Sequence, residues 1–226
     1  MEYHTDKEIT QNYINLLVEK IKFESSGFCN VYLRNGEIFR HNIGFEMPFN
    51  SQFEIPISSD GKCLFLPSWE RGVFAFSTMT GEKIWQFKKS GIIRVLLSSH
   101  CLLALRYGKE LIKLDPYTGE VIQILKSGTL EHIFKIDSRC LFLDRFRGKY
   151  SIIDVDTWKP IRSYPNNIVN PHNCLTCCIR KVYLQGNQLC IEGFEEYPEQ
   201  NYACPGTVTF CRIIDSDFSK LAQTYY

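Results

Sequence analysis

Three stretches of this chain decide its fold: Val73-Phe-Ala-Phe-Ser-Thr-Met-Thr-Gly-Glu-Lys-Ile-Trp85, Leu111-Ile-Lys-Leu-Asp-Pro-Tyr-Thr-Gly-Glu-Val-Ile122 and Tyr150-Ser-Ile-Ile-Asp-Val-Asp-Thr-Trp-Lys-Pro-Ile161. Each contains an alternating apolar run, a short polar turn around a threonine, and a second alternating run. This pattern predicts two antiparallel strands joined by a tight turn. Gly81 and Gly119 supply the positive φ that such turns often require.

A cysteine marks the same place in each stretch. Cys101 follows Cys63 by 38 positions, and Cys140 follows Cys101 by 39. Each of these cysteines precedes its turn threonine (Thr80, Thr118 or Thr157) by 17 positions. Because a free cysteine behaves as a small buried hydrophobe, we expect the three to be core residues of a repeated strand.

The repeat divides into units of about 53–89, 90–127, 128–165 and 172–226, with four short strands expected in each. Four strands in about forty residues are typical of a β-propeller blade. Ahead of the repeats, Asn35-Gly36 predicts a hairpin of Cys29–Leu33 with Glu37–His41. This hairpin forms either a reduced fifth blade or the end of an open ring. An immunoglobulin-like sandwich is the main rival fold, but it does not predict a fixed cysteine-to-threonine offset.

The N-terminal segment has a different pattern. Thr5 and Glu8 form a capping-box pair, and apolar residues follow at helical spacing at positions 9, 13, 16, 17 and 21. We therefore expect an amphipathic helix over about residues 6–22, with 1–24 packed on one domain formed by 25–226. A helix that binds a partner is the alternative. The expected fold class is all-β: a small propeller-like array of about four four-stranded blades plus the hairpin, preceded by this helix.

Composition narrows the classes of function. The 226 residues are 44% apolar and 23% charged, and 26 basic against 25 acidic residues give a net charge of +1. This balance argues against duplex DNA or an anionic membrane as the main partner. No run of 18 apolar residues is present, and the first residues lack a basic region followed by an apolar one. We therefore expect a cytoplasmic protein whose ten cysteines are reduced.

The turn segments resemble a known family. Asp115, Thr118, Gly119, Thr80, Gly81 and Trp85 match the quinoprotein-type propeller repeat, in which a tryptophan after Thr-Gly docks between blades. The resemblance covers about residues 53–164 and implies a fold without implying the quinone cofactor. Trp158 departs from it by standing at the glycine position. WD-repeat propellers are similar in period, but their Gly-His and Trp-Asp pairs are absent.

No sequence motif predicts catalysis or a cofactor. The chain has no nucleophile elbow, zinc-protease motif, P-loop or dinucleotide fingerprint, so we expect no enzyme activity and no cofactor. The best metal candidate combines short-spaced thiols and a histidine: His172, Cys174, Cys177, Cys178 and Cys190. A second Cys-x-x-Cys pair is absent, and buried strand cysteines are the favoured interpretation, so no metal is predicted.

The repeat locates a binding face at one end of the propeller, where the loops between second and third strands lie. These loops combine aromatic and basic residues: Trp69, Arg71, Arg106, Tyr107, Arg145, Phe146 and Arg147. An acidic and aromatic insertion over 193–203, with Glu195, Glu196 and Tyr197, interrupts the fourth unit at the same loop. Aromatic residues and arginine are enriched at interface hot spots. The alternative is that the basic loops and the acidic insertion pair with each other.

We therefore expect a non-catalytic module that binds a partner protein, in a specific version an inhibitor or immunity-type protein that occludes a toxin or enzyme. Two other classes stay open. A propeller hydrolase or lyase acting on a small molecule or glycan would need a carboxylate–histidine constellation that forms only in three dimensions. Single-stranded nucleic acid would stack on the aromatic loops, although the net charge and the acidic insertion argue against it.

Overall fold

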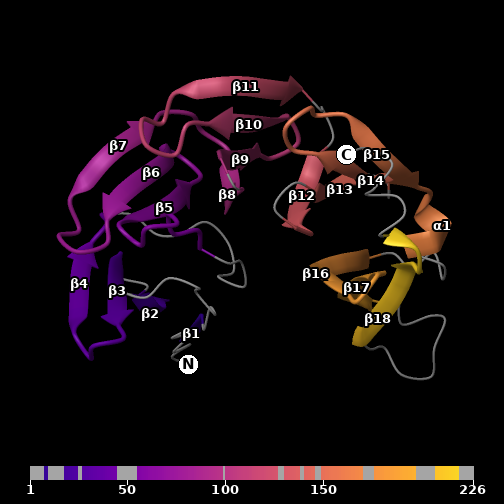
Figure 1. Cartoon of the computed structure of the whole chain (residues 1–226), viewed down its shortest axis with the longest axis horizontal. Coiled ribbons are helices and arrows are strands. Elements are labelled where there is room, and N and C mark those ends of the chain that lie inside the picture. The colour runs from indigo at the N-terminus through magenta and orange to yellow at the C-terminus, as the bar shows by residue number, and fades with distance from the viewer. Residues whose placement is uncertain are drawn as a thin grey trace. The chain divides into compact units, whose positions relative to one another are not determined.

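The computed structural model describes residues 8–9, 18–24, 27–44, 55–98, 100–126, 130–137, 140–145, 149–169, 176–196 and 207–218. In this part of the chain, five antiparallel sheets form, and the one helix is α1 (Asn166–Val169) (Figure 1). The all-β prediction is therefore confirmed. Among the same residues, no helix is long and apolar enough to cross a membrane.

The chain divides into two compact units, Met1–Lys126 and Ser127–Tyr226. The division falls at the boundary expected between the second and third repeats. Each unit has its own hydrophobic clusters, so each is described separately below.

The first sheet of unit 1 contains β1 (Glu8–Ile9), β2 (Val18–Phe23), β3 (Phe28–Leu33) and β4 (Ile38–Asn42), in that order. The Asn35-Gly36 hairpin is confirmed as β3–β4, and two further strands complete a four-stranded sheet.

The predicted helix over 6–22 is wrong where the structure describes it, because Glu8–Ile9 and Val18–Phe23 are paired strands. A β-bulge between Val18 and Lys20 also interrupts the strand alternation. The extra residue places Val18 and Ile21 three positions apart on the same buried face, which imitates a helical period. The rest of the expected helix, residues 10–17, lies outside the described residues.

The first repeat forms β5 (Cys63–Ser68), β6 (Gly72–Ser77) and β7 (Lys83–Phe87), and the second forms β8 (Ile92–Leu97), β9 (Leu102–Arg106), β10 (Glu110–Leu114) and β11 (Val121–Lys126). The strand expected over 53–57 is not formed in its described part, where Ile57 makes an isolated bridge to Leu64.

Strand alternation packs the middle sheet of unit 1 against both of its neighbours. Leu64 and Leu66 of β5 join a core with Ile21 and Val31 of the first sheet. Phe65 between them joins a second core, shared with β8–β10. Successive side chains of a strand point to opposite faces, which explains why β5 is almost entirely buried. Face-to-face packing of successive sheets is the arrangement that the repeat predicts.

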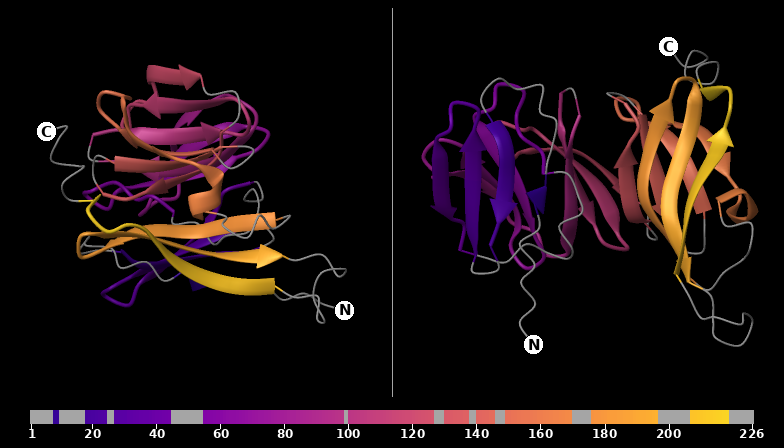
Figure 2. Two further views of the ribbon diagram at one scale, coloured as in Figure 1. Left: turned by 90° about the vertical axis from the view of Figure 1, so that its right-hand side faces the viewer. Right: turned by 90° about the horizontal axis from the view of Figure 1, so that it is seen from below.

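Unit 2 contains one sheet of β12 (Leu130–Lys135), β13 (Cys140–Arg145), β14 (Lys149–Asp154) and β15 (Pro160–Tyr164), and another of β16 (Thr176–Gln185), β17 (Gln188–Glu196) and β18 (Thr207–Asp215). Phe142 and Ile152 of the first sheet share a core with Ile179 and Ile191 of the second. The three long strands β16–β18 run side by side and twist together (Figure 2). The last expected strand, 221–225, lies outside the described residues.

One turn structure occurs in all three repeats. Ser77, Asp115 and Asp154 stand at its first position, and their side-chain oxygens accept the main-chain N–H of Thr80, Thr118 and Thr157 at 3.1, 2.8 and 2.7 Å. The residue after each threonine adopts a left-handed conformation, with φ of 69° at Gly81, 74° at Gly119 and 58° at Trp158. Trp158 therefore keeps the turn geometry of the glycines it replaces, and the three turns share one structure.

The cysteines at the start of the repeated strand are only partly characterised. Cys101 is buried, as a core position requires, whereas Cys63 is only half-buried and packs at the edge of a core cluster. Cys140 begins β13, but its side chain lies outside the described part of the chain.

Candidate protein-interaction surface

Two strand-connecting turns of unit 1 are joined into one surface by main-chain hydrogen bonds. The turn between β5 and β6 contains Trp69, and the turn between β9 and β10 contains Tyr107. Gly91, between the two repeats, donates its N–H to the Trp69 carbonyl at 2.5 Å and accepts the Tyr107 N–H at 2.9 Å. The predicted convergence of these loops is therefore present for the first two repeats.

An exposed aromatic pair stands on this surface. Trp69 and Tyr107 are 44% and 48% exposed, and their ring centroids lie 6.4 Å apart with the planes tilted by 50°. A tilted pair at this distance is a favourable geometry for aromatic rings. The pair thus offers apolar area that the rigid turns hold in place.

A buried carboxylate orders the basic residues beneath the pair. Glu110, at the start of β10, accepts Lys89 Nζ at 2.5 Å and Arg106 Nη1 at 3.3 Å on the same oxygen. Burial raises the pKa of the Glu110 carboxyl, but hydrogen bonds and charge from Lys89 and Arg106 outweigh this and hold the pKa below its usual range. Glu110 is therefore an anion whose charge two cations already balance.

Arg106 serves to position the turn. Its Nε donates to the Ser90 carbonyl at 2.9 Å while Nη1 reaches Glu110. The side chain is only 22% exposed, so most of it is held inside the surface. Arg71 differs, because the residue is exposed and is held through its main chain: its carbonyl accepts Gln86 Nε2 at 3.1 Å and its N–H donates to Ser68 Oγ at 3.3 Å.

We define the aromatic–basic surface by its exposed residues: Trp69, Arg71, Lys88, Tyr107 and Lys109. Glu70 is also exposed in the first turn. The exposed charges are therefore three cations, Arg71, Lys88 and Lys109, and one carboxylate. With Glu110 neutralised from within, the surface has a local positive charge although the whole chain is nearly neutral.

Glycines make these turns sterically possible. Gly72 has φ of 100°, and a Cβ there would lie 2.0 Å from the Phe87 carbonyl oxygen. Only glycine lets the first turn approach β7 so closely.

The remaining predicted site residues belong to unit 2, and the structure describes few of their side chains. Arg145 lies at the end of β13 without a described side chain, and Phe146, Arg147 and Tyr197 lie outside the described residues. Glu196 is the last residue of β17, again without a described side chain.

Glu195 is an interior residue, so its predicted partner contact is corrected. β17 continues to Glu196, past the expected strand end at Glu192, and strand alternation turns Ile191, Gly193 and Glu195 inward. The Glu195 carboxylate pairs with Arg212 of β18, and both side chains are largely buried. The negative charge of Glu195 is therefore paired with Arg212 inside the same sheet.

Few sequence signals indicate the groups that order the surface. Glu110 stands where the sister strands have Gly72 or Lys149, so a charge at a strand start was the one available signal. Gly91 and Ser90 act through main-chain atoms, which residue type does not reveal.

Unit 2 contains a buried acidic pair. Asp144 of β13 pairs in register with His132 of β12 and Tyr150 of β14, and Glu131 occupies the bulge beside His132. Burial and then the nearby charge of Glu131 raise the pKa of Asp144 to about 7. Burial also raises the pKa of Glu131.

The proposed thiol site is divided by strand register. Cys177 pairs with Glu195, whereas Cys190 pairs with Tyr183, which lies six positions beyond Cys177 on β16. This separates the two thiols by roughly 20 Å. Among the described residues, no three His, Cys, Asp or Glu side chains form a group suited to a metal, and His172 and Cys174 lie outside them.

Comparison with known proteins identifies the fold. No protein-family model matches the chain, and no curated protein sequence matches it. BamB from Moraxella catarrhalis is similar in structure, with a TM-score of 0.62 at 14% identity over 96% of this chain. The dihydro-heme d1 dehydrogenase NirN in complex with DHE has a TM-score of 0.58 at 12% identity over 77% of this chain.

These likenesses concern architecture. The chain spans 62% of the BamB chain and 39% of the NirN chain. Solved structures that match number 943 chains, so the fold is too widely used to indicate an activity. At the level of fold, the chain resembles the quinoprotein-type and WD-like β-propeller superfamily.

Proposed function

We propose that this chain is a protein-interaction module that binds its partner through the aromatic–basic surface. The exposed Trp69–Tyr107 pair carries the proposal. Two large aromatic side chains on a monomer surface are costly to leave in water and are the residue types that dominate interface hot spots.

The chemistry of the surface also indicates the kind of partner. Arg71, Lys88 and Lys109 are exposed on the turns that carry the aromatic pair and on the segment between the repeats, and Glu110 is already neutralised by Lys89 and Arg106. A segment with an apolar or aromatic anchor flanked by carboxylates would complement this arrangement. An inhibitor or immunity-type role is a special case, in which the bound partner also loses its own activity.

The test is a comparison of three chains as bait in a native lysate: the wild type, the double variant Trp69→Ala/Tyr107→Ala, and Tyr117→Ala as a matched control. Tyr117 is 62% exposed in the same repeat but stands on the β10–β11 turn, at the other end of the strands. We expect the wild type and the control to capture the same protein and the double variant to lose it. With the captured protein purified, its dissociation constant should rise about thirtyfold or more, as for a hot-spot truncation.

Two results would contradict the proposal. In one, the double variant captures the partner as well as the wild type does. In the other, single-stranded oligonucleotides bind the wild type with a steep salt dependence and no protein is captured, which would favour the nucleic-acid alternative.

One observation supports a second candidate, a hydrolase or lyase. Asp144 lies opposite His132 in the β12–β13 pairing with Glu131 beside it, and a carboxyl group whose pKa is raised to about 7 suits general acid or base catalysis. If a substrate is found, Asp144→Asn should abolish its turnover while Trp69→Ala leaves it unchanged. The reverse dependence would exclude this site.

A further inference from the structure

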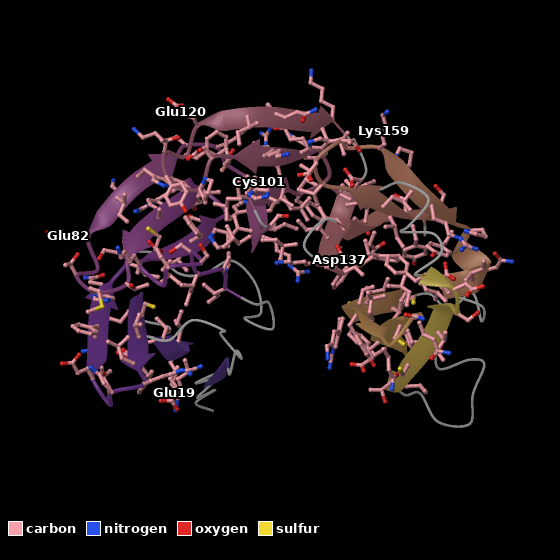
Figure 3. All side chains as sticks on the ribbon, in the orientation of Figure 1. Glu19, Glu82, Cys101, Glu120, Asp137 and Lys159 are labelled. Carbon is pink, nitrogen blue, oxygen red and sulfur yellow. The ribbon has the colours of Figure 1, made fainter. Side chains whose placement is uncertain are left out.

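The outer strand of the second repeat is an unusually exposed sheet edge. β11 is the last strand of its sheet, in the order β11-β10-β9-β8. Val121, Ile122 and Ile124 are 45%, 53% and 40% exposed. β11 follows Glu120, whose side chain points away from the sheet in Figure 3.

The strands that end the other described sheets, β4, β7, β15 and β18, are protected in ways that β11 is not. Arginines lie within β4, β15 and β18 (Arg40, Arg162 and Arg212), and β15 also begins at Pro160. In β7, Trp85 is engaged, since its Nε1 donates to the Pro116 carbonyl at 3.1 Å. Natural sheets use charges, prolines and cover to prevent edge pairing, and the five residues Val121–Leu125 have neither charge nor proline.

The sequence of this edge complements itself. Read from either end, Glu120-Val-Ile-Gln-Ile-Leu-Lys126 has a charge, an apolar pair, a central glutamine, an apolar pair and the opposite charge. In a two-fold antiparallel pairing centred on Gln123, Ile122 lies opposite Ile124 of the second copy. Glu120 then lies opposite Lys126 of the second copy, and the symmetry makes this ion pair twice.

We propose that β11 pairs with β11 of a second copy of this chain and forms an antiparallel homodimer. The pairing extends the sheet across the two-fold axis and covers the exposed isoleucines. β11 contains a β-bulge, in which Ile122 is the extra residue between the pairs Leu114–Val121 and Lys113–Gln123. Each dimer presents two aromatic–basic surfaces, which increases the avidity for a multivalent partner.

The symmetry gives a charge-swap experiment. Glu120→Lys places a lysine opposite Lys126 of the second copy, and Lys126→Glu places two glutamates opposite each other. By sedimentation equilibrium we expect a wild-type dimer, and roughly a tenfold or greater rise in the dissociation constant for each single variant. The two single variants mixed together should form a heterodimer, because every cross-pair is then of opposite charge. The double variant Glu120→Lys/Lys126→Glu should dimerise like the wild type.

Substitution of the apolar centre provides the second arm. Ile122→Lys should leave a monomer with an unchanged thermal midpoint, since the side chain is exposed in the single chain. Glu82→Lys, at the equivalent position after the first-repeat turn, is the matched control and should leave the dimer intact. A wild-type chain that stays monomeric throughout the concentration series overturns the proposal. The proposal is also overturned if Ile122→Lys leaves the dimer intact, or if the two single charge variants do not form a heterodimer when mixed.

Discussion

At the scale of single residues, Asp144 has the largest effect on how stability depends on pH. The residue is 7% exposed, and its pKa is raised from 3.8 to about 7, first by burial and then by Glu131. The folded chain therefore keeps this proton at a pH where the unfolded chain has lost it. This contribution to the free energy of unfolding is complete below about pH 4 and is lost as the pH rises to 7.

We predict that Asp144→Asn is more stable than the wild type at pH 8 and nearly equal to it at pH 4, because the amide imitates the protonated acid. The difference at pH 8 should reach up to about 4 kcal/mol, which corresponds to about three pKa units. Guanidinium titrations of both chains at the two pH values measure it. Glu131→Gln should act in the same direction by a smaller amount. Equal stability of Asp144→Asn and the wild type at pH 8 would show that the carboxyl group is not destabilising in the fold.

Gly119 carries a different constraint, because it packs against Trp85 of the preceding repeat. Its φ is 74°, and a Cβ there would lie 2.6 Å from Trp85 Cε3. We predict that Gly119→Ala lowers the free energy of unfolding by about 1–3 kcal/mol more than Gly108→Ala does. Gly108 has a similar φ of 61° but open space around it, so the difference isolates the tryptophan contact. If both variants lose the same free energy of unfolding in thermal or denaturant unfolding, the Trp85 ring moves aside without a free-energy penalty.

His41 occupies the same place one sheet earlier. Its Nε2 lies 3.0 Å from the Thr78 carbonyl, and a Cβ at Gly81 would meet the imidazole ring. In unit 1, an aromatic ring of one sheet therefore packs against the turn glycine of the next sheet at two places: His41 against Gly81, and Trp85 against Gly119. The resemblance predicted this for Trp85, whereas nothing in the residue type of His41 distinguished it from the scattered histidines.

At the scale of elements, the repeat was the most readable feature. The tight turns of the three repeats, including the one at Trp158, follow from their positions relative to the cysteines, because turn chemistry is local. The N-terminal strands could not be predicted in the same way. Their spacing depends on the bulge between Val18 and Lys20, which is set by pairing with β3.

The candidate surface was predicted only in part, because only some of its residues follow from local sequence patterns. Trp69, Arg71 and Tyr107 follow from the loop positions in the repeat. The inward direction of Glu195 depends on how far β17 continues, and the sequence changes composition there without a turn signal. Glu110 is ordered by residues from two other segments, so no local pattern reveals it.

The ion pairs of Glu110 with Lys89 and Arg106, which we call the Glu110 clamp, give a prediction at the scale of elements. Glu110→Gln leaves Lys89 and Arg106 without their shared counter-charge in a largely buried position. We predict a loss of about 1–3 kcal/mol in unfolding free energy, together with weaker partner binding because the β9–β10 turn loosens. Glu70→Gln is the control, since Glu70 is exposed. Calorimetric unfolding of the two variants measures the effect, and similar midpoints would mean that the clamp does not stabilise the turn.

At the scale of the whole molecule, each unit has the means to fold around its own core. Among the described residues, the first unit has clusters on the two faces of the β5–β7 sheet, and the second has one between its two sheets. The aromatic–basic surface and the β11 edge both belong to the first unit. The buried acidic pair belongs to the second, so binding and pH dependence are expected to respond to different substitutions.

The central claim is that a partner protein binds the end of unit 1 that carries Trp69 and Tyr107. Hydrogen exchange of the chain with and without the captured partner tests it most directly. The account predicts slower exchange on binding over residues 68–72, 88–91 and 106–109, with no change in the opposite turns at 78–81 and 115–119. Protection confined to the opposite turns, or to unit 2, would contradict it.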